Sequence, residues 1–383
     1  MRILHLADLH IGKRVNGFSM LEDQKYILNQ ILGIVKERQT EVVLIAGDVY
    51  DKAIPSAEAV EVFDDFLTKL VEAKQKVLLI SGNHDSEERL AFASQVMKKS
   101  GVYFAPVFSG NIEKVTLQDE CGNIHFYMLP YMKPTKAVEN LKKLLNESDA
   151  TTLESATTSK RLTNNECEKI NKTERNILLA HQFLTGATPS ESEEFSVGGI
   201  ENIDAQMFED FDYVALGHIH RAQQVGKEYI RYAGTPLKYS FSEVNHKKSV
   251  TIVEIKEKGN IEIELLPLKP LRDMRDLKGT YMELTARENY QDADTNDYVH
   301  ITLTDEEDII DVIAKLRVIY PNLMKLDYDN TRTRSRQNIC MEEQVEQKSP
   351  MELFSDFYLQ QNNQEMTKEQ YEFAKQILEK ISC

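Results

Sequence analysis

Seven side chains of metal-binding type stand where five short apolar runs of this sequence end. They are Asp8, His10, Asp48, Asn83, His181, His218 and His220. Continuous aliphatic runs are typical of strands buried on both faces, and ligands of open α/β sheets gather beyond the ends of such strands. We therefore expect one convergent polar site whose donors are oxygen and imidazole nitrogen, with no thiolate.

The spacing and number of these residues suit a pair of metal ions. Asp8 and His10 are two positions apart, so in an extended segment their side chains share a face, and His218 and His220 repeat that spacing. Four histidines, two aspartates and one asparagine divide well between two cations, with one carboxylate able to bridge them. Nitrogen and oxygen ligands without sulfur fit Mn²⁺, Fe or catalytic Zn²⁺ better than Ca²⁺ or a structural zinc.

Each motif taken alone is weak, because a histidine after a strand is usually structural and Gly-Asp or Gly-Asn pairs are usually turns. The joint pattern over five runs is what predicts a site. Four other histidines lack this setting and are expected to be structural: His5, His125, His246 and His300.

The elements that must position these residues alternate between strands and helices. The five runs predict strands at 2–7, 42–46, 77–80, 177–180 and 213–216. Apolar residues recur at helical spacing over 21–35 and 59–70, between the first three strands. This alternation favours parallel pairing in the first half of the chain, whereas 114–118 and 125–129 look like an antiparallel hairpin.

The chain of 383 residues is long enough for more than one domain. The segment Pro267–Leu271 reads as a boundary, so we expect a first domain over residues 1–270. A polar insertion at 146–174 interrupts it and is expected to be mobile or weakly helical.

A compact unit of strands and helix is expected over residues 275–335. Its pattern predicts strands at 280–284, 298–303 and 324–328, with a helix over 306–320. The last segment, 349–383, is expected to form a helix pair, because capping signals recur at Ser349–Glu352 and at Thr367–Gln370. The apolar faces of these helices must pack either on their own domain or against a partner's helices.

Composition narrows the class of protein. A formal net charge of -16 argues against unaided binding of nucleic acid, although two bound cations would add about four positive charges at the site itself. No apolar run approaches the ~18 residues that span a bilayer. Four scattered cysteines, without metal or disulfide spacing, favour the cytoplasm: Cys121, Cys167, Cys340 and Cys383.

The site motifs resemble those of the calcineurin-like metallophosphoesterase superfamily. They are Asp8-x-His10, Gly47-Asp48-x-x-Asp51, Gly82-Asn83-His84-Asp85, His181 and Gly217-His218-x-His220. Four longer stretches resemble the nucleases of SbcCD complexes, the bacterial kin of the Mre11 nucleases: Ala7–Lys13, Gly217–Arg221, Tyr232–Pro236 and Tyr239–Glu243. The resemblance implies an α/β (α+β) fold, a four-layer αββα sandwich with a small α+β capping domain at 275–335 and the terminal helix pair.

The resemblance also implies how the ligands divide. Asp8, His10 and His220 would hold one metal ion, Asn83, His181 and His218 would hold the other, and Asp48 would bridge the two. The ions would be Mn²⁺, with Mg²⁺, Fe or Zn²⁺ as alternatives. His84 would stabilise the transition state or protonate the leaving oxygen.

Other residues receive looser roles from the same resemblance. Asp51 and Asp85 would either orient neighbouring groups or serve as ordinary turn and N-cap aspartates. Lys13, Arg221 and Tyr239 would contact DNA or a partner.

The activity implied is Mn²⁺-dependent hydrolysis of phosphodiester bonds in DNA, in repair, recombination and replication. Such enzymes degrade duplex ends from 3′ to 5′ and cut single strands and hairpins. The sequence contains no G-x-x-x-x-G-K-[ST] loop, so ATP dependence would come from an SMC-like ATPase, SbcC, docked on 349–383. A homodimer within a heterotetramer is implied, through helices over 56–72 and 86–99.

Two other interpretations remain open. The same scaffold serves phosphomonoesterases, phosphoprotein phosphatases and cyclic-nucleotide phosphodiesterases, and the metal ligands cannot discriminate among them. The cap and the terminal helices favour the nuclease. A non-catalytic scaffold is the second alternative, and the complete ligand set disfavours it.

Overall fold

The computed structural model describes residues 1–145, 170–190, 192–193, 203–334 and 366–381, together with five isolated residues between 351 and 359. The chain divides into two compact units, Met1–Leu271 and Arg272–Cys383, and each is described by itself. Most of the polar insertion, residues 146–169, lies outside the described residues, so its expected character stays a prediction.

The first unit contains a mixed sheet of six strands in the order β14-β13-β1-β4-β5-β6. Four of them are parallel: β1 (Arg2–Leu6), β4 (Val42–Ala46), β5 (Lys76–Ile80) and β6 (Val102–Ala105). Antiparallel strands β13 (Ser249–Ile255) and β14 (Ile261–Pro267) extend the sheet beyond β1. All five residues of β4 are buried, which explains the unbroken aliphatic run.

A second sheet of six strands has the order β11-β12-β10-β9-β8-β7. Its strands are β7 (Glu113–Asp119), β8 (Gly122–Leu129), β9 (Arg175–His181), β10 (Tyr213–Gly217), β11 (Gln223–Val225) and β12 (Lys227–Tyr232). Strands β8, β9, β10 and β12 run parallel, whereas β7 and β8 form the expected antiparallel hairpin.

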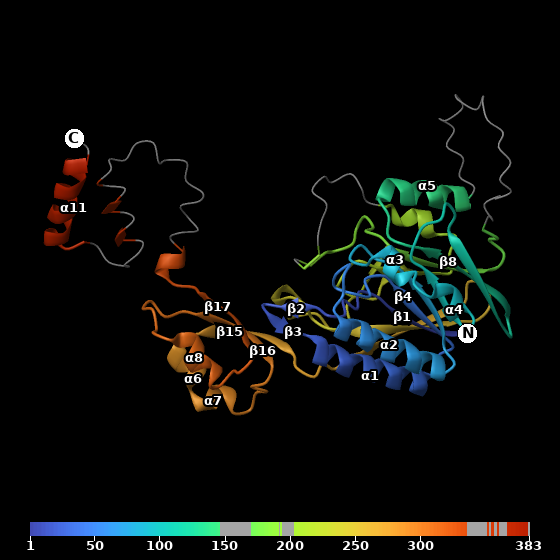
Figure 1. Ribbon diagram of the computed structural model, residues 1–383, viewed down its shortest axis with the longest axis horizontal. Helices are drawn as coiled ribbons and strands as arrows, with labels where there is room; N and C mark the ends of the chain where they lie inside the picture. The colour runs from blue at the N-terminus through green and yellow to red at the C-terminus, as the bar shows by residue number, and fades with distance from the viewer. Residues whose placement is uncertain are drawn as a thin grey trace, which may run out of the picture. The chain divides into compact units, whose positions relative to one another are not determined.

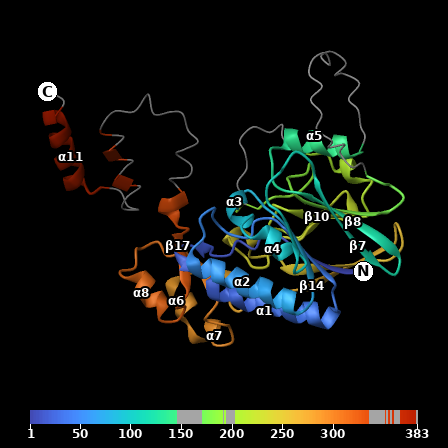
Figure 2. The same cartoon turned by 45° about the vertical axis from the view of Figure 1, so that its right-hand side comes forward.

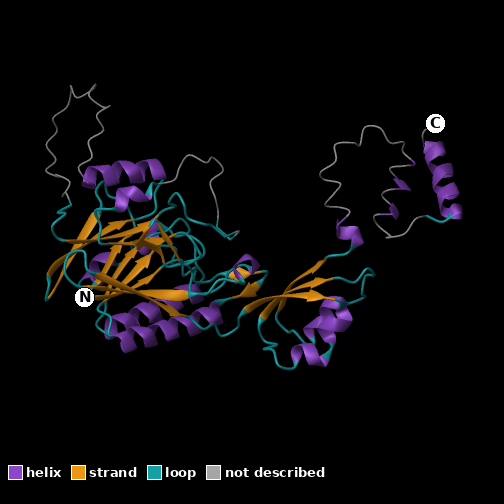
Figure 3. Cartoon of the chain, turned by 180° about the vertical axis from the view of Figure 1, so that it is seen from behind, coloured by secondary structure: helices purple, strands orange, loops and turns teal. Residues whose placement is uncertain are grey.

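The two sheets pack face to face, and helices cover their outer faces (Figures 1 and 3). The core between the sheets joins Ile3, Leu44 and Leu78 of the first to Phe126 and Ile177 of the second. Helices α1 (Leu21–Arg38) and α2 (Ala57–Glu72) cover the first sheet, and α5 (Pro134–Leu145) packs on the second. The expected αββα sandwich is therefore confirmed.

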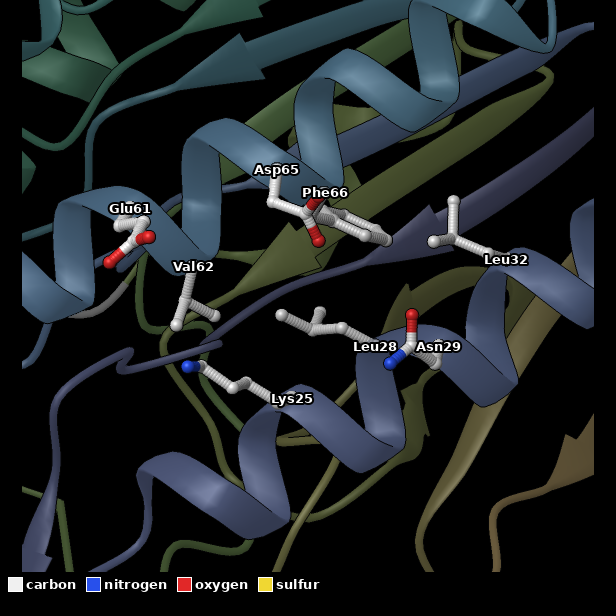
Figure 4. A pocket seen from close by; sticks show the side chains of 8 residues that line it. All are labelled: Lys25, Leu28, Asn29, Leu32, Glu61, Val62, Asp65 and Phe66. Carbon is white, nitrogen blue, oxygen red and sulfur yellow. The ribbon is translucent and has the colours of Figure 1, made fainter.

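Helices α1 and α2 lie side by side in both views (Figures 1 and 2), and their sequences explain their positions. Ser56 caps the N-terminus of α2, because its side chain accepts a hydrogen bond from the Ala59 amide, and the helix buries a stripe of apolar residues. A groove between the two helices is lined by Lys25, Leu28, Asn29, Leu32, Glu61, Val62, Asp65 and Phe66 (Figure 4). None of the predicted site residues lies in it.

The segment expected as one helix over 86–99 is two short helices, α3 (Glu87–Leu90) and α4 (Ser94–Lys98). The break falls at Ala93, whose φ of 59° places it in the left-handed region and ends helical continuity. Two further small elements, the β2–β3 hairpin (Arg14–Val15, Phe18–Ser19) and the 3₁₀ helix η2 (Phe241–Glu243), flank the site.

The second unit is built on three parallel strands, β15 (Met274–Gly279), β16 (Tyr298–Leu303) and β17 (Leu323–Tyr328). Its helices are α6 (Tyr281–Thr285), α7 (Arg287–Tyr290) and α8 (Val312–Arg317). A core of its own joins Val299 and Ile301 to Leu316 and Tyr320.

One predicted strand of this unit is wrong, because residues 280–284 begin helix α6. The Glu283 amide donates to the Thr280 hydroxyl at 3.3 Å, and the Thr280 amide donates to the Glu283 carboxylate at 2.8 Å. This capping box overrides the strand propensity of the segment, and the strand lies just before it in β15. The helix expected over 306–320 is shorter and spans Val312–Arg317.

The second helix of the expected terminal pair is present as α11 (Lys368–Ile381). It starts as its capping signal predicts, since the Gln370 amide donates to the Thr367 hydroxyl and the Thr367 amide to the Gln370 side chain. The first helix, from Ser349, falls mostly outside the described residues. Within the described part of the chain, no helix is long and apolar enough to cross a membrane.

Candidate metal centre

The carboxyl ends of strands from both sheets meet at one place. The Asp8 amide donates to the Gly47 carbonyl at 3.1 Å, and the His10 amide donates to the Asp48 carbonyl at 2.9 Å. A third bond crosses between the sheets, from the His218 amide to Asp8 Oδ1 at 2.9 Å. Parallel pairing thus places the predicted residues together, as their positions in the sequence suggest.

Asn83, His181 and His218 form the first group of side chains. Asn83 Oδ1 lies 3.0 Å from His181 Nε2 and 3.0 Å from His218 Nδ1. His181 Nδ1 lies 2.8 Å from the Ala46 carbonyl, which only accepts, so this nitrogen carries the proton of the neutral ring. The lone pair on Nε2 then faces the Asn83 oxygen, which is also an acceptor. A cation bound between the two atoms would remove this repulsion.

His10 and His220 form the second group. Their Nε2 atoms are 3.2 Å apart. Two nitrogens that bind one cation at about 2.1 Å lie roughly 3.0–3.4 Å apart when their bonds meet at right to tetrahedral angles. The separation therefore fits two ligands of a single metal ion.

Asp48 stands between the two groups. Its Oδ2 is 3.7 Å from His10 Nε2 and 3.5 Å from His181 Nε2. Burial acts to raise the pKa of this carboxyl, but the neighbouring histidines, His181 first, hold it below its ordinary range. In the opposite sense, burial acts to lower the pKa of His181, but the Asp48 carboxylate raises it to about 9. Positive charge is therefore favoured at this point, whether a proton or a cation supplies it.

Asp8 completes the cluster and is fully buried. Oδ1 of Asp8 accepts a hydrogen bond from the His218 amide. Oδ2 of Asp8 is buried and has no hydrogen-bond partner among the described residues, and the same holds for Nδ1 of His10. Burial raises the pKa of Asp8 to about 7 and lowers that of His218 to about 3. Unpaired acceptors and neutral imidazoles of this kind fit divalent cations.

Four non-glycine residues of the cluster have left-handed backbone. Their φ angles are 54° at Asp8, 44° at His10, 50° at Asp48 and 101° at His218. Such conformations cost about 1–3 kcal/mol each and persist where the surrounding structure imposes them. Their concentration at one point is typical of a functional site.

Close approach explains two of the glycines in the motifs. A Cβ on Gly47, where φ is 86°, would collide with the His181 imidazole. A Cβ on Gly217 would collide with the Ala46 carbonyl oxygen and stand 2.7 Å from His181 Nδ1. Side chains at these positions would displace His181.

His84 lies beside the cluster and is partly exposed. Its Nδ1 lies 3.0 Å from the Asp51 carbonyl oxygen, to which it donates, and its ring centroid is 4.9 Å from that of His10. One ring nitrogen of His84 also falls within 4.8 Å of ligand atoms of His10 and Asp48. His84 therefore lies next to the ligand atoms of His10 and Asp48.

The two aspartates with looser expected roles support the loops. Asp85 accepts the amides of Val49, Tyr50 and Gly82 at 3.0–3.1 Å, and burial raises its pKa to about 6. Asp51 pairs with Lys13 at 2.8 Å. Asp85 thus ties the loop after β4 to the loop after β5.

The three residues expected at DNA have different positions. Arg221 is exposed and Lys13 is bound to Asp51. Tyr239 is only 4% exposed, and its hydroxyl donates to the Leu9 carbonyl at 2.6 Å and accepts from Gln24 Nε2 at 2.9 Å. Contact of Tyr239 with DNA or a partner stays a prediction, whereas in this structure its hydroxyl holds the loop after β1 to helix α1.

Several polar residues around the site escaped sequence reasoning. Gln24 of α1 donates to the His10 carbonyl at 2.7 Å. The ring of Tyr131 stacks on that of His218, with the two ring centroids 6.3 Å apart. Glu243 and Ser192 contact His220. Glu243 is the last residue of the Tyr239–Glu243 stretch that resembles the family, so the sequence contained a signal for it. Gln24 and Ser192 lie outside every such stretch, so no sequence pattern marks them.

Comparison with known proteins places the chain among its relatives. The family described as "Calcineurin-like phosphoesterase" matches residues 1–222, and "Type 5 capsule protein repressor C-terminal domain" matches residues 270–362. The chain is 31% identical to the SbcD component of the nuclease SbcCD of Staphylococcus epidermidis, over 99% of this chain and 98% of that protein.

Two further comparisons extend this result. The chain is 34% identical to the SbcD component of Staphylococcus saprophyticus, over 85% of this chain and 84% of that one. A solved dimetal phosphatase from Danio rerio covers 70% of this chain and 96% of its own, at 11% identity and a TM-score of 0.41, too low to support an argument. On the sequence matches, the chain belongs to the calcineurin-like phosphoesterases and, within them, to the SbcD family of metal-dependent nucleases.

Proposed function

We propose that this protein hydrolyses phosphodiester bonds in DNA with two Mn²⁺ ions that share Asp48. The observation that carries the proposal is the position of Asp48 Oδ2, 3.7 Å from His10 Nε2 and 3.5 Å from His181 Nε2, between two groups of ligand atoms. Asp8, His10 and His220 would hold one ion, and Asn83, His181 and His218 the other. Imidazole-rich ligation favours Mn²⁺, Fe or Zn²⁺ over Mg²⁺.

The chemistry follows from this arrangement. Two divalent cations supply charge that neutralises a scissile phosphate and lower the pKa of a water molecule. The Asp51 carbonyl accepts the Nδ1 proton of His84 at 3.0 Å, which leaves Nε2 of the ring for substrate. We assign His84 to transition-state stabilisation or to proton donation to the leaving oxygen, and Lys13 and Arg221 to contacts with DNA.

The substrates and the partner are proposed from the family. The curated relatives are named as parts of SbcCD nucleases, which supports an SMC-like ATPase partner, SbcC. We propose cleavage of duplex ends from 3′ to 5′ and of single strands and hairpins, in DNA repair, recombination and replication. The net charge of -16 supports a partner that provides part of the DNA-binding surface.

Cleavage of an end-labelled DNA hairpin tests this function. We expect Mn²⁺-dependent cleavage by the protein alone, and ATP-dependent degradation of duplex ends only when the ATPase is added. Hydrolysis of p-nitrophenyl phosphate or of a cyclic nucleotide without any DNA cleavage would instead assign the scaffold to a phosphomonoesterase or a cyclic-nucleotide phosphodiesterase.

A further inference from the structure

A buried ionic network stands behind His220, on the side away from His10. Its carboxylate, Glu243, is fully buried and comes from the 3₁₀ helix η2. Glu243 Oε1 lies 3.2 Å from His220 Nδ1 and accepts the Ser192 hydroxyl at 2.7 Å. Ser192 Oγ itself lies 3.0 Å from the same nitrogen of His220.

These contacts determine which nitrogen of His220 carries the proton. The single hydroxyl proton of Ser192 is given to Glu243, so its oxygen is left to accept from His220. The Glu243 carboxylate is also an acceptor. Both partners therefore require a proton on Nδ1, and the lone pair of the neutral ring lies on Nε2, which faces His10 Nε2 at 3.2 Å.

Lys248 fixes the carboxylate from the other side. Its ammonium donates to Glu243 Oε2 at 2.6 Å, to Thr235 Oγ1 at 2.6 Å and to the His220 carbonyl at 2.9 Å. Three donors thus meet three acceptors, and the buried ammonium is fully satisfied. Lys248 both neutralises Glu243 and holds the backbone of His220.

We propose that Glu243 is a positioning residue that holds His220 in the tautomer and orientation needed to bind a divalent cation, with Lys248 locking the carboxylate in place. The inference rests on the proposed metal site and adds to it a residue that touches neither cation nor substrate. A carboxylate behind a metal-binding histidine typically changes metal affinity by about 10- to 100-fold.

Substitution of Glu243 by Gln tests this role directly. Lys248 is donor-only, so it draws the amide oxygen to its side and turns the amide N–H toward His220 Nδ1. That nitrogen must then accept, which moves the ring proton to Nε2 and blocks the lone pair needed by the cation. In ¹⁵N-histidine-labelled protein without metal, we expect the His220 signals to change from the Nδ1–H to the Nε2–H tautomer.

Mn²⁺ binding, measured as free ion by electron paramagnetic resonance, gives the second readout. Wild type should bind two equivalents, and Glu243→Gln should bind one of them about 10- to 100-fold more weakly. The matched control is Asp212→Asn, which alters another buried carboxylate that pairs with a lysine, here the exposed Lys258 at 2.8 Å, at the opposite end of β10. It should lower thermal stability without changing Mn²⁺ affinity.

A second variant covers the case in which Glu243→Gln fails to fold. Glu243→Met/Lys248→Met removes both buried charges together, a change that folded proteins often tolerate. It should also weaken one equivalent of Mn²⁺. Unchanged affinity and an unchanged tautomer in either folded variant would overturn the role of Glu243, whereas failure of wild type to bind two equivalents would overturn the metal site itself.

Discussion

His84 is the residue on which the proposed mechanism depends most. It is one position from Asn83, it is partly exposed, and its Nδ1 proton is committed to the Asp51 carbonyl. Its distance to His10 and Asp48 is short enough for a ligand as well. Only a comparison of metal content with activity separates the two roles.

Replacement of His84 by Ala should leave metal binding intact and remove activity. We expect two equivalents of Mn²⁺ in the variant and a cleavage rate lower by about 10²- to 10⁴-fold, since a single proton donor is lost. Cleavage of single-stranded DNA and metal content on the same sample would measure both. A parallel loss of bound Mn²⁺ would make His84 a ligand and remove its catalytic assignment.

At the residue scale, the sequence predicts groups that carry a spacing signal and misses those that do not. Asp8 and His10, or His218 and His220, are marked by strand ends and two-residue spacing, and the structure brings them together. Gln24 and Ser192 reach the site through tertiary packing alone, which no local pattern encodes. Tyr239 shares a motif with Glu243, but the motif does not report that both side chains are buried.

At the scale of elements, the site depends on how closely strand ends approach one another. Gly217→Ala places a Cβ against the Ala46 carbonyl and His181, and we expect a loss of about 1–3 kcal/mol in the free energy of unfolding. Gly33→Ala, in the exposed interior of α1 with open space around it, should gain about 0.5–1 kcal/mol. Urea unfolding of both variants measures these changes. Equal changes in the free energy of unfolding would contradict the close contact of Gly217 with Ala46 and His181.

Arg175, at the end of β9 opposite the metal centre, forms an ion pair within the second sheet and a hydrogen bond that reaches the first. Arg175 of β9 donates to Asp119 of β7 at 2.5 and 3.0 Å and to the Lys256 carbonyl, beyond β13, at 2.7 Å. Hydrogen bonds from Arg175 hold the pKa of Asp119 well below its ordinary range. A lowered pKa in the folded state stabilises the fold above the unfolded value of about 3.9, and this stabilisation is lost as pH falls toward the folded value.

Asp119→Asn should therefore destabilise the protein in a manner that depends on pH. At pH 7 we expect a loss of about 1–3 kcal/mol, because the buried guanidinium loses its charged partner. The gap to wild type should narrow as the pH falls below about 4. Unfolding by urea over a pH series measures the gap, and a gap independent of pH would refute the ion-pair account.

Elements were predictable where one signal acts alone. Strand β4 is buried throughout and reads correctly from its aliphatic run. Residues 280–284 carry both β-type residues and a Thr-x-x-Glu capping box, and the local hydrogen bonds of the box prevail. The helix expected over 86–99 is interrupted at Ala93, whose left-handed φ cannot be predicted from the sequence.

At the scale of the whole molecule, the expected division into parts is a proposal that the contacts support. The boundary between the two compact units falls after Leu271, close to the boundary read from the prolines at 267 and 270. Composition and motifs alone do not reveal how the units cooperate with a partner. That depends on surfaces such as α11, where Phe373 is 66% exposed.

Deletion of residues 349–383 should abolish association with the ATPase and spare Mn²⁺-dependent cleavage of single-stranded DNA. The exposed apolar residues of α11 offer a finer version, in which Phe373→Asp should reduce co-purification and Glu372→Ala, another exposed position on the same helix, should not. Co-purification unchanged by the deletion would rule out this segment as the docking site.

The count of bound Mn²⁺ in the Asp48→Asn variant is the most direct measurement of the central claim. If Asp48 joins two cation sites, wild type binds two equivalents tightly, and the variant, which keeps the shape of the side chain but loses its charge, binds neither tightly and cleaves no hairpin DNA. Tight binding of two equivalents by Asp48→Asn would show that the strand ends hold their metals without a shared carboxylate, and would contradict the account.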